Sequence, residues 1–371
     1  MPEICLVMIV RDEAHVIERS LRSVMPLIGR WCIVDTGSTD RTPTIIEAAL
    51  AGLPGALHHR PWIDFGHNRS EAMRLARGQG DWLLLIDADE ELVIDPPFVL
   101  PESDGVDAWQ ILQRPGNTAT EFHLPRLLRA DRPWRFEGVL HEYLACDVPF
   151  RQSTLEGLSQ IGHFDSARNR QPQRQKYLKD ADVLKKALER EPDHSRYQFY
   201  LAQSLRDAGE IEAAIDAYRR RSEMQGWDEE RFCALLELAR LLERQSVAHA
   251  SAGHASVISA YLDAWNARPT RAEPLVELAR IHRQREEHAL AQLYAERAAA
   301  LPRPADLLFV DASVYRWRAK DELSVASYWT GQAGLAARLA RELLEGEALP
   351  ASERERVAAN LRFFDADAGS G

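Results

Sequence analysis

The period of the hydrophobic pattern changes once along this chain, and that change limits the folds it can adopt. Up to about residue 165, short continuous apolar runs such as "ICLVMIV" alternate with segments whose apolar residues recur at helical spacing. Continuous apolar runs are typical of strands that are buried on both faces. Strands that alternate with helices predict an open, mostly parallel α/β sheet.

Four strands and three helices of this sheet follow from the pattern. The strands are expected in "ICLVMIV", "WCIVD", "ALHHRPW" and "WLLLID", and the helices in "EAHVIERSLRSVMPLI", "TDRTPTIIEAALAGL" and "NRSEAMRLARG". Asp40 is well placed to accept the first free N–H groups of the second helix, and Pro43 is tolerated in a first turn.

Acidic residues follow three of the predicted strands, at the edge where α/β sheets bind ligands. Asp12 and Glu13 follow the first strand, Asp35 ends the second, and Asp87 and Asp89 follow the fourth. Crowded carboxylates repel one another unless a positive group lies among them. Mg²⁺ and Mn²⁺ prefer oxygen ligands, and Mg²⁺ is usually held by one or two carboxylates together with substrate phosphates. The pattern therefore predicts that a divalent metal and a diphosphate bind here. For any single carboxylate, the alternative is a structural role, as a helix cap or in a solvated turn.

The second half of the chain is helical from about residue 175 to the end. Tyr261 and Tyr294 are 33 residues apart, as are Pro269 and Pro302, and small residues recur at the expected helix crossings. This pattern resembles tetratricopeptide helix–turn–helix repeats, with an ordinary helical bundle as the alternative. Such repeats stack into a solenoid with a concave binding face. Because 371 residues are too many for one ordinary core, we expect two domains, 1–168 and 175–371.

Charge and cysteine content exclude several classes of protein. The formal net charge is −11, which argues against a general nucleic-acid binder. The four cysteines are far apart and form no CxxC pair, so we expect reduced thiols and no zinc site. "MPEICLVMIVRDEAH" lacks the basic start of a signal peptide, and no run approaches the ~20 apolar residues of a membrane span. The expected location is cytoplasmic, or at most peripheral to the inner membrane.

A set of motifs carries a resemblance to a known family. The segments "VMIVRDEAHVIERSLRSV", "IVDTGSTDRT", "DFGHNRSEAMRLA", "WLLLIDADEEL" and "FEGVLHE" occur in this order. Their order and spacing resemble family 2 of the inverting nucleotide-sugar glycosyltransferases, in particular bacterial members fused to tetratricopeptide repeats. The resemblance implies a GT-A fold, which is one Rossmann-like domain that binds a nucleotide diphospho-sugar through Mn²⁺ or Mg²⁺.

The resemblance also implies roles for particular residues. Asp35 would accept a hydrogen bond from the base, Glu13 would bind the ribose hydroxyls, and Arg69 would meet a phosphate. Asp89 would ligate the metal directly, with Asp87 near the ribose or metal and His163 as a third ligand. The other residues expected in the nucleotide-sugar pocket are Val10, Arg11, Asn68, Ala88 and His141. Instead of binding a ligand, both histidines could have a structural role. Likewise, Asn68 could be a helix cap and Arg69 an ordinary surface arginine.

A carboxylate beside the acceptor takes the proton from the attacking hydroxyl in this class of enzyme. Glu142 is the first candidate for this general base, and Glu137 is the second. One in-line displacement would invert the anomeric centre, and no covalent nucleophile is needed. The chain departs from the family in "DTGSTD", which has one acidic residue where many relatives have two before the glycine, and in "HNR", which replaces the commoner "ARN". Ribose recognition and the side chain that faces the phosphates are therefore open.

Three functions remain open on the sequence. The first is a metal-dependent glycosyltransferase of the hexosyltransferase type, with UDP favoured over GDP or dTDP by family frequency. Its acceptor hydroxyl or thiol belongs to a peptide or protein held by the helical half, or else to a lipid-linked or envelope saccharide or a small metabolite. The helical half alternatively forms a homodimer. The second function is an inactive interaction scaffold. The third is a nucleotidyltransferase, although the chain lacks the Gly-rich basic loop that such enzymes carry near the N-terminus.

Overall fold

In a computed structural model, the chain forms two compact units, residues 1–210 and residues 211–371. The structure describes residues 2–102, 104–116, 118–170, 172–249 and 253–368. The first unit contains the sheet together with the first two long helices of the helical half. The domain limits drawn above from sequence stay a prediction.

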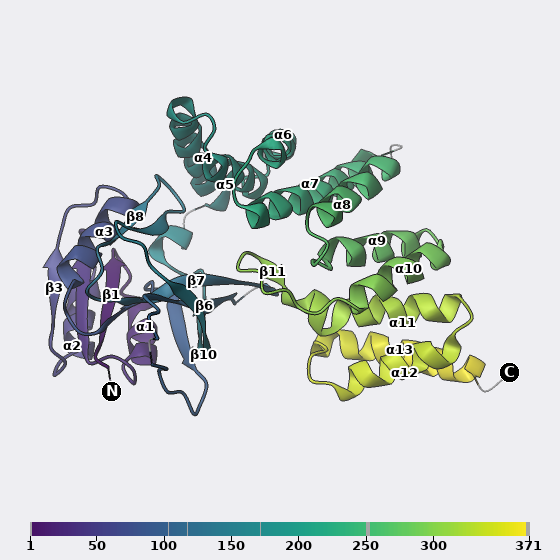
Figure 1. Cartoon of the computed structure of the whole chain (residues 1–371), viewed down its shortest axis with the longest axis horizontal. Coiled ribbons are helices and arrows are strands. Elements are labelled where there is room, and N and C mark those ends of the chain that lie inside the picture. Colours follow the sequence, from purple (N-terminus) through teal and green to yellow (C-terminus); the bar gives the residue numbers. More distant parts are fainter. Residues whose placement is uncertain (1, 103, 117, 171, 250–252, 369–371) are drawn as a thin grey trace. The chain divides into compact units, whose positions relative to one another are not determined.

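The N-terminal part of the first unit has the predicted alternation of strands and helices (Figure 1). Its elements are β1 (Ile4–Val10), α1 (Ile17–Val24), β2 (Arg30–Asp35), α2 (Thr42–Ala49), β3 (Gly55–His59), α3 (Phe65–Ala76) and β4 (Trp82–Leu85). The four strands lie in the order β3-β2-β1-β4, and every neighbouring pair is parallel. Their carboxyl ends therefore meet at one edge of the sheet, as predicted.

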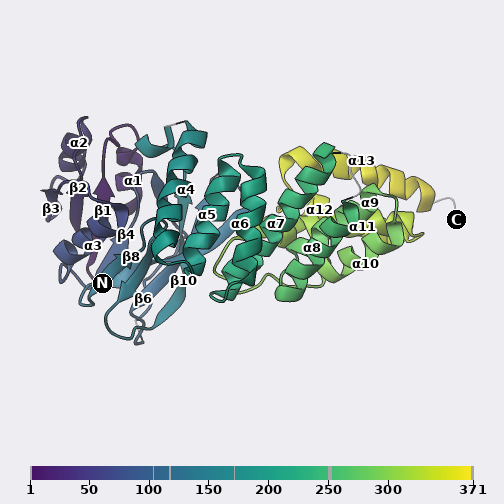
Figure 2. The same ribbon diagram turned by 90° about the horizontal axis from the view of Figure 1, so that it is seen from above.

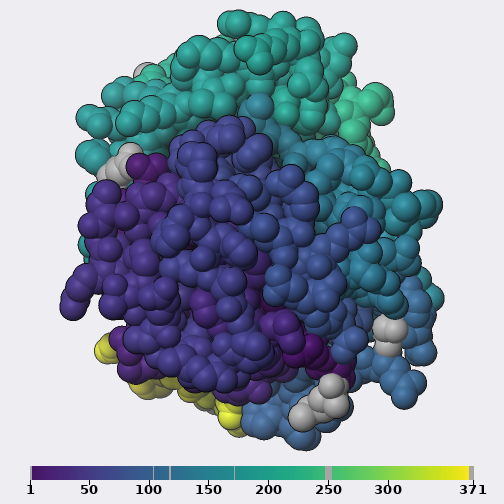
Figure 3. All heavy atoms as spheres, turned by 90° about the vertical axis from the view of Figure 1, so that its left-hand side faces the viewer, coloured from purple at the N-terminus to yellow at the C-terminus, as the bar shows by residue number. Residues whose placement is uncertain are grey.

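Alternate residues of β1 pack on opposite faces of the sheet, since side chains of a strand alternate between its two faces. Leu6 and Met8 join a core with residues of α1 and α2, whereas Cys5 and Val7 join a core with residues of α3. The helices thus cover both faces of the strands, which explains why β1 is apolar throughout. Viewed from the side of β3, the segments coloured purple and blue form a continuous surface (Figure 3).

The sheet continues beyond β4 with strands of mixed direction, where the sequence suggested further alternation with helices. The later strands are β5 (Glu90–Ile94), β6 (Ala108–Pro115), β7 (Thr120–Arg129) and β10 (Gln152–Gly162), in the sheet order β4-β7-β6-β10-β5. β7 is antiparallel to β4 and to β6, and β5 is antiparallel to β10. Without crossover helices, successive strands pair as hairpins, which makes this half antiparallel in part. The strands β8 (Trp134–Glu137) and β9 (Tyr143–Cys146) form a separate antiparallel hairpin.

A short segment connects β10 to the last helices of the first unit. It contains the 3-10 helix η1 (Ala167–Arg170), after which α4 (Gln173–Arg190) and α5 (Ser195–Asp207) pack against each other. All three elements contribute residues to the cavity described below.

The second unit consists mainly of helices that pack in order along the chain (Figures 1 and 2). They are α6 (Ile211–Glu223), α7 (Asp228–His249), α8 (His254–Ala267), α9 (Glu273–Gln284), α10 (His288–Ala299), the π-helical turn η2 (Val314–Arg318), α11 (Ala319–Trp329), α12 (Ala333–Glu345) and α13 (Ala351–Ala368). Tyr261 and Tyr294 occupy equivalent places in α8 and α10, and Pro269 and Pro302 follow those helices. The offset of 33 residues therefore reflects a repeated helix pair, as predicted from the tetratricopeptide-like pattern.

No helix among the described residues is both long and apolar enough to cross a membrane. All four cysteines are free thiols. Burial raises the pKa of Cys5 to about 12 and that of Cys32 to about 11, so both remain protonated at neutral pH.

Asp64 caps the helix that carries Arg69, because its Oδ1 accepts the N–H of His67 at 2.7 Å. We expect Asp64→Ala to destabilise the first unit by about 1 kcal/mol, since the first turn of α3 loses a hydrogen-bond acceptor. Asp64→Ser keeps an acceptor and should retain most of the stability. Denaturant unfolding of both variants tests this, and equal stabilities would show that the cap does not stabilise α3.

Candidate active site

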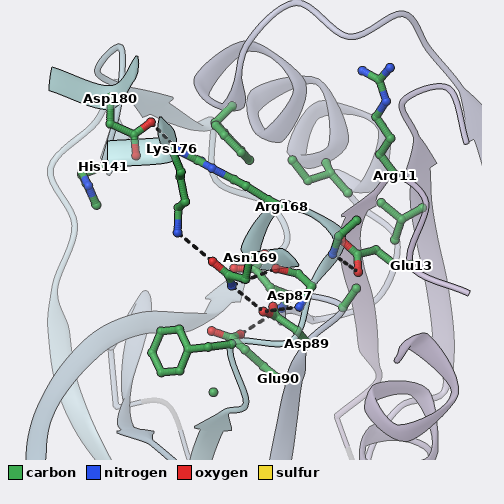
Figure 4. A pocket seen from close by; sticks show the side chains of 18 of the residues that line it. Arg11, Glu13, Asp87, Asp89, Glu90, His141, Arg168, Asn169, Lys176 and Asp180 are labelled. Carbon is green, nitrogen blue, oxygen red and sulfur yellow. Dashed lines mark hydrogen bonds and ion pairs between the residues drawn. The ribbon is translucent and has the colours of Figure 1, made fainter. Parts of the chain in front are cut away.

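A cavity of about 970 Å³ lies at the carboxyl ends of β1 and β4, within the first unit. Residues of the loops after β1 and β4 form one wall, and residues of β6, η1, α4 and α5 contribute the others (Figure 4). Of the residues predicted for the site, those that line the cavity are Val10, Arg11, Glu13, Arg69, Asp87, Ala88, Asp89 and His141. The topology thus brings side chains from distant segments together around one space.

Two arginines lie among the acidic residues that follow β4. Arg69 Nη2 donates to Asp87 Oδ1 at 2.6 Å, and Arg126 Nη2 donates to Glu90 Oε1 at 2.9 Å. Burial alone would raise the pKa of Asp87, but the charges of Arg69 and Arg126 outweigh it and hold that pKa below its usual value. Protein cations therefore neutralise part of the acidic cluster, for which the sequence suggested only a metal.

Asp89 points into the cavity and contacts the segment that follows β10 (Figure 4). Its Oδ2 accepts the backbone N–H of Ser166 and the side-chain amide of Asn169, both at 3.3 Å. These are long hydrogen bonds from neutral donors, and both fall on the same oxygen. Asp89 thus keeps a carboxylate oxygen for a ligand in the cavity.

Glu13 also contacts the segment that follows β10, and it is only 8% exposed. Its two carboxylate oxygens lie 3.3 and 3.2 Å from the backbone nitrogen of Ala167, which donates to them. Burial, followed by the repulsion of Asp89, Asp40 and Asp165, outweighs that hydrogen bond and raises the pKa of Glu13 to about 7. Glu13 is therefore a partly protonated carboxyl group at neutral pH, which suits hydrogen bonding to hydroxyl groups.

The raised pKa of Glu13 predicts a pH-dependent stability. Between about pH 4.5 and 7 the folded chain holds a proton that the unfolded chain has released, so the stability due to Glu13 is full below the unfolded pKa and is lost as pH rises through 7. Glu13→Gln removes this titration. At pH 8 we expect it to be more stable than the wild type by up to roughly 3 kcal/mol, and at pH 4.5 to be equal to it.

Denaturant titrations of both chains at the two pH values measure the difference. Glu47→Gln is the control, because Glu47 is exposed on α2 and should change neither value. A Glu13→Gln variant that gains no stability at pH 8 would contradict the account of Glu13.

Five predicted residues are not among the described residues that line the cavity: Asp35, Asn68, Glu137, Glu142 and His163. Asp35 is buried, lies 3.1 Å from Nδ1 of His59 and accepts the N–H of Ser38. Asn68 is fully buried, accepts the N–H of Ile63 at 3.0 Å and donates to the carbonyl of Pro61 at 3.0 Å. In the "HNR" sequence it is therefore Arg69, and not Asn68, that faces the cavity.

The two candidate bases differ in their surroundings. Glu142 Oε1 lies 2.8 Å from Nε of Arg69, so Arg69 lies between Glu142 and Asp87. Glu137 accepts from the hydroxyl of Tyr143 and pairs with Arg135, and these two contacts lower its pKa. Glu142 thus contacts Arg69, which lines the cavity, whereas the contacts of Glu137 are with residues of its own hairpin.

His141 lines the cavity as a neutral ring. It stacks on Tyr200 of α5, with ring centroids 4.0 Å apart and planes 9° from parallel. The packing of protein around the ring, followed by the charges of Arg196, Arg168 and Lys176, lowers the pKa of His141, although part of the residue is exposed. At neutral pH it can hydrogen-bond to a ligand but offers no charge to a diphosphate.

The side chains predicted to bind metal do not form a preformed cage. His163 Nε2 lies 3.0 Å from Oε2 of Glu91, and Asp87 faces arginines. Across the described residues, no group of three or more His, Cys, Asp or Glu side chains is arranged to hold a metal. Mg²⁺, however, is commonly held by one or two carboxylates plus substrate phosphates. The available oxygen of Asp89 fits an ion that arrives with a diphosphate.

Sequence reasoning missed the residues that follow His163. Arg168, Asn169, Lys176 and Asp180 all line the cavity, and Arg168 Nη2 donates to Asp180 Oδ1 at 2.7 Å. They lie at the junction of the two predicted domains, 1–168 and 175–371, and no role in a site was assigned to them. The one signal there was a run of basic residues, "RNRQPQRQK", in a chain with net negative charge.

Parts of this chain match known proteins. Residues 5–96 match the sequence model of glycosyl transferase family 2. A TPR repeat-containing protein of Synechococcus elongatus is 44% identical over 96 residues, which are 26% of this chain and 22% of that protein. An uncharacterized glycosyltransferase of Rickettsia bellii is 37% identical over 84 residues, or 23% of this chain and 26% of that protein. This chain therefore matches only about a quarter of the length of each of these curated relatives.

Among solved structures, the crystal structure of MamA overlaps 52% of this chain and 97% of its own chain, with a TM-score of 0.35 and 17% identity. The matched family segment, residues 5–96, runs from β1 to just beyond β5 and holds Glu13, Arg69 and Asp89. Residues 5–96 thus resemble glycosyl transferase family 2, and this segment precedes a tetratricopeptide-like array of helix pairs.

Proposed function

We propose that this protein transfers a sugar from a nucleotide diphospho-sugar, with UDP as the nucleotide, to a hydroxyl or thiol acceptor. The observation that carries the proposal is the cavity itself. It is large enough for a nucleotide sugar, and the family 2 segment supplies its acidic wall. Asp89 offers a carboxylate to a metal, while Arg11 and Lys176 add positive charge. Carboxylates and cations around one space suit a diphosphate bound with a divalent ion.

In this proposal each wall of the cavity has a task. Val10, Arg11 and Glu13 bind the nucleoside, with Glu13 accepting or donating to ribose hydroxyls. Asp35 holds the loop at the nucleoside end of the cavity, because it accepts the N–H of Ser38. Thr36 of this loop lines the cavity. Asp89 and the diphosphate would hold Mn²⁺ or Mg²⁺, which when bound supplies positive charge to the leaving group. His163 would become a ligand of the metal only after its contact with Glu91 breaks.

We assign proton removal from the acceptor to Glu142. Its contact with Arg69 keeps it beside Asp87 at the edge of the cavity, and its neighbour His141 lines that cavity. An attack on the anomeric carbon from the side opposite the diphosphate inverts the centre in one step, with Glu142 accepting the proton. Because solenoids of helix pairs commonly hold extended peptides, we favour a peptide or protein as the acceptor.

Release of UDP from donors tests the proposed function. The full chain is incubated with UDP-glucose, UDP-N-acetylglucosamine and UDP-galactose in the presence of Mn²⁺, with GDP- and dTDP-sugars alongside. Slow hydrolysis of one donor, abolished by EDTA and by Asp89→Asn, is the expected result. A chain that binds nucleotides but releases nothing, even with candidate peptide acceptors, would favour the inactive scaffold instead.

A further inference from the structure

Lys176 extends from α4 into the cavity and carries a charge that no neighbouring carboxylate neutralises directly (Figure 4). It is half-buried, and its Nζ donates to Oδ1 of Asn169 at 2.7 Å. Within the described part of the chain, no carboxylate oxygen lies within 4 Å of Nζ. Besides this amide, Nζ lies over the ring of Tyr177, 4.8 Å from its centroid, and neither partner carries a negative charge. A partly desolvated ammonium group with only neutral partners is costly unless an anion joins it.

The other buried cations around the cavity are paired within the protein. Arg69 contacts Asp87 and Glu142, and Arg168 contacts Asp180. Arg11 is exposed, so water solvates its charge. Lys176 therefore differs from its neighbours in being both partly buried and available to a ligand.

One amide side chain links Lys176 to the carboxylate proposed to hold the metal. Asn169 presents its oxygen to Lys176 and its nitrogen to Oδ2 of Asp89, at 2.7 and 3.3 Å (Figure 4). The carboxylates of Asp89, Asp180 and Asp207 act on Lys176 only at longer range. The ammonium group and the carboxylate thus face the same part of the cavity from opposite sides, with room for a group that attracts both a cation and a metal.

We propose that Lys176 binds the diphosphate of the donor, so that the first helix beyond the catalytic sheet completes the nucleotide-sugar site. This inference rests on the proposed function and assigns it a residue outside the family 2 segment, residues 5–96. An ammonium group binds phosphate oxygens as a point charge without fixed geometry. On binding, phosphate oxygens replace the amide oxygen of Asn169 as the partner of Lys176.

Comparing a diphosphate with a nucleoside isolates this contact. Binding of UDP with Mn²⁺ is measured by calorimetry, and binding of uridine by ligand-observed NMR, on the full chain and on Lys176→Met. We expect the affinity for UDP to fall roughly ten- to a hundredfold, as for loss of a hydrogen bond to a charged group, and the affinity for uridine to stay within a factor of two. Lys176→Arg should recover part of the UDP affinity.

Lys185→Met is the matched control, because Lys185 lies nine residues further along α4, is exposed and is not among the residues that line the cavity. It should bind UDP as the wild type does. Equal UDP affinity of wild type and Lys176→Met would overturn the inference while leaving the proposed function intact. A parallel loss of UDP and uridine binding would also overturn it, since it would indicate a structural role. A wild-type chain that binds neither ligand would instead refute the proposed function.

Discussion

Replacing Arg69 with methionine is expected to destabilise the first unit by about 3–5 kcal/mol. Arg69 lies between Asp87 and Glu142, at 2.6 and 2.8 Å, and its side chain is 16% exposed. Without the guanidinium, Glu142 loses its cation, and Asp87 keeps only Arg126, at 3.8 Å. Breaking a buried ion pair by removing one partner costs more than the pair itself contributes, because the remaining charge stays desolvated. Denaturant unfolding followed by tryptophan fluorescence measures the loss.

Two further variants separate this effect from a general sensitivity of α3. Arg74→Met makes the same change on the same helix at a side chain that is 70% exposed, where we expect a change below about 0.5 kcal/mol. Adding Glu142→Gln to Arg69→Met removes the carboxylate that has lost its cation and should restore part of the stability. If the double variant is no more stable than Arg69→Met, the electrostatic explanation is wrong.

The second large effect is expected at Asp89. Asp89→Asn keeps the shape of the side chain and an oxygen to accept from Ser166 and Asn169, but it loses the charge that a divalent ion needs. Changes in residues that merely support metal ligands cost about 10–100-fold in metal affinity, so loss of a direct ligand should weaken Mn²⁺-dependent UDP binding roughly a hundredfold or more. Titration of UDP into both chains with Mn²⁺ measures this ratio.

Asp95→Asn serves as the control for Asp89→Asn. It makes the same chemical change six residues away, at an exposed position after β5 that does not line the cavity. We expect it to bind UDP as the wild type does. Binding that Asp89→Asn leaves unchanged would exclude Asp89 as a metal ligand.

The sequence was sufficient for the parts of the fold that depend on local pattern. The apolar runs of β1, β2 and β4 and the helical spacing of α1 and α3 predicted parallel strands with helices between them. From that topology alone, Glu13 and Asp89, which are 76 residues apart, were expected near each other, and both line the cavity. A parallel sheet brings strand ends together whatever lies between them in sequence.

The parts that could not be predicted depend on contacts between distant segments. Arg126 on β7 neutralises Glu90, yet nothing in "FHLPRLLR" marks its arginine as a partner of that carboxylate. The hairpin strands from β5 to β10 also lack the clear periods of the first four strands. Arg168 and Lys176 reach the cavity only because η1 and α4 pack where they do, and the spacing of residues along one helix does not contain that information.

Calorimetric titration of UDP into the full wild-type chain, with Mn²⁺ and then with EDTA, tests the central claim most directly. The cavity beside Asp89, Arg69 and Lys176 predicts saturable binding of one UDP per chain with Mn²⁺ and a large loss of affinity when EDTA removes the metal. Binding of UDP, GDP and dTDP that is absent with both Mn²⁺ and Mg²⁺ would contradict the account, and the interaction scaffold would then be the better description of this protein.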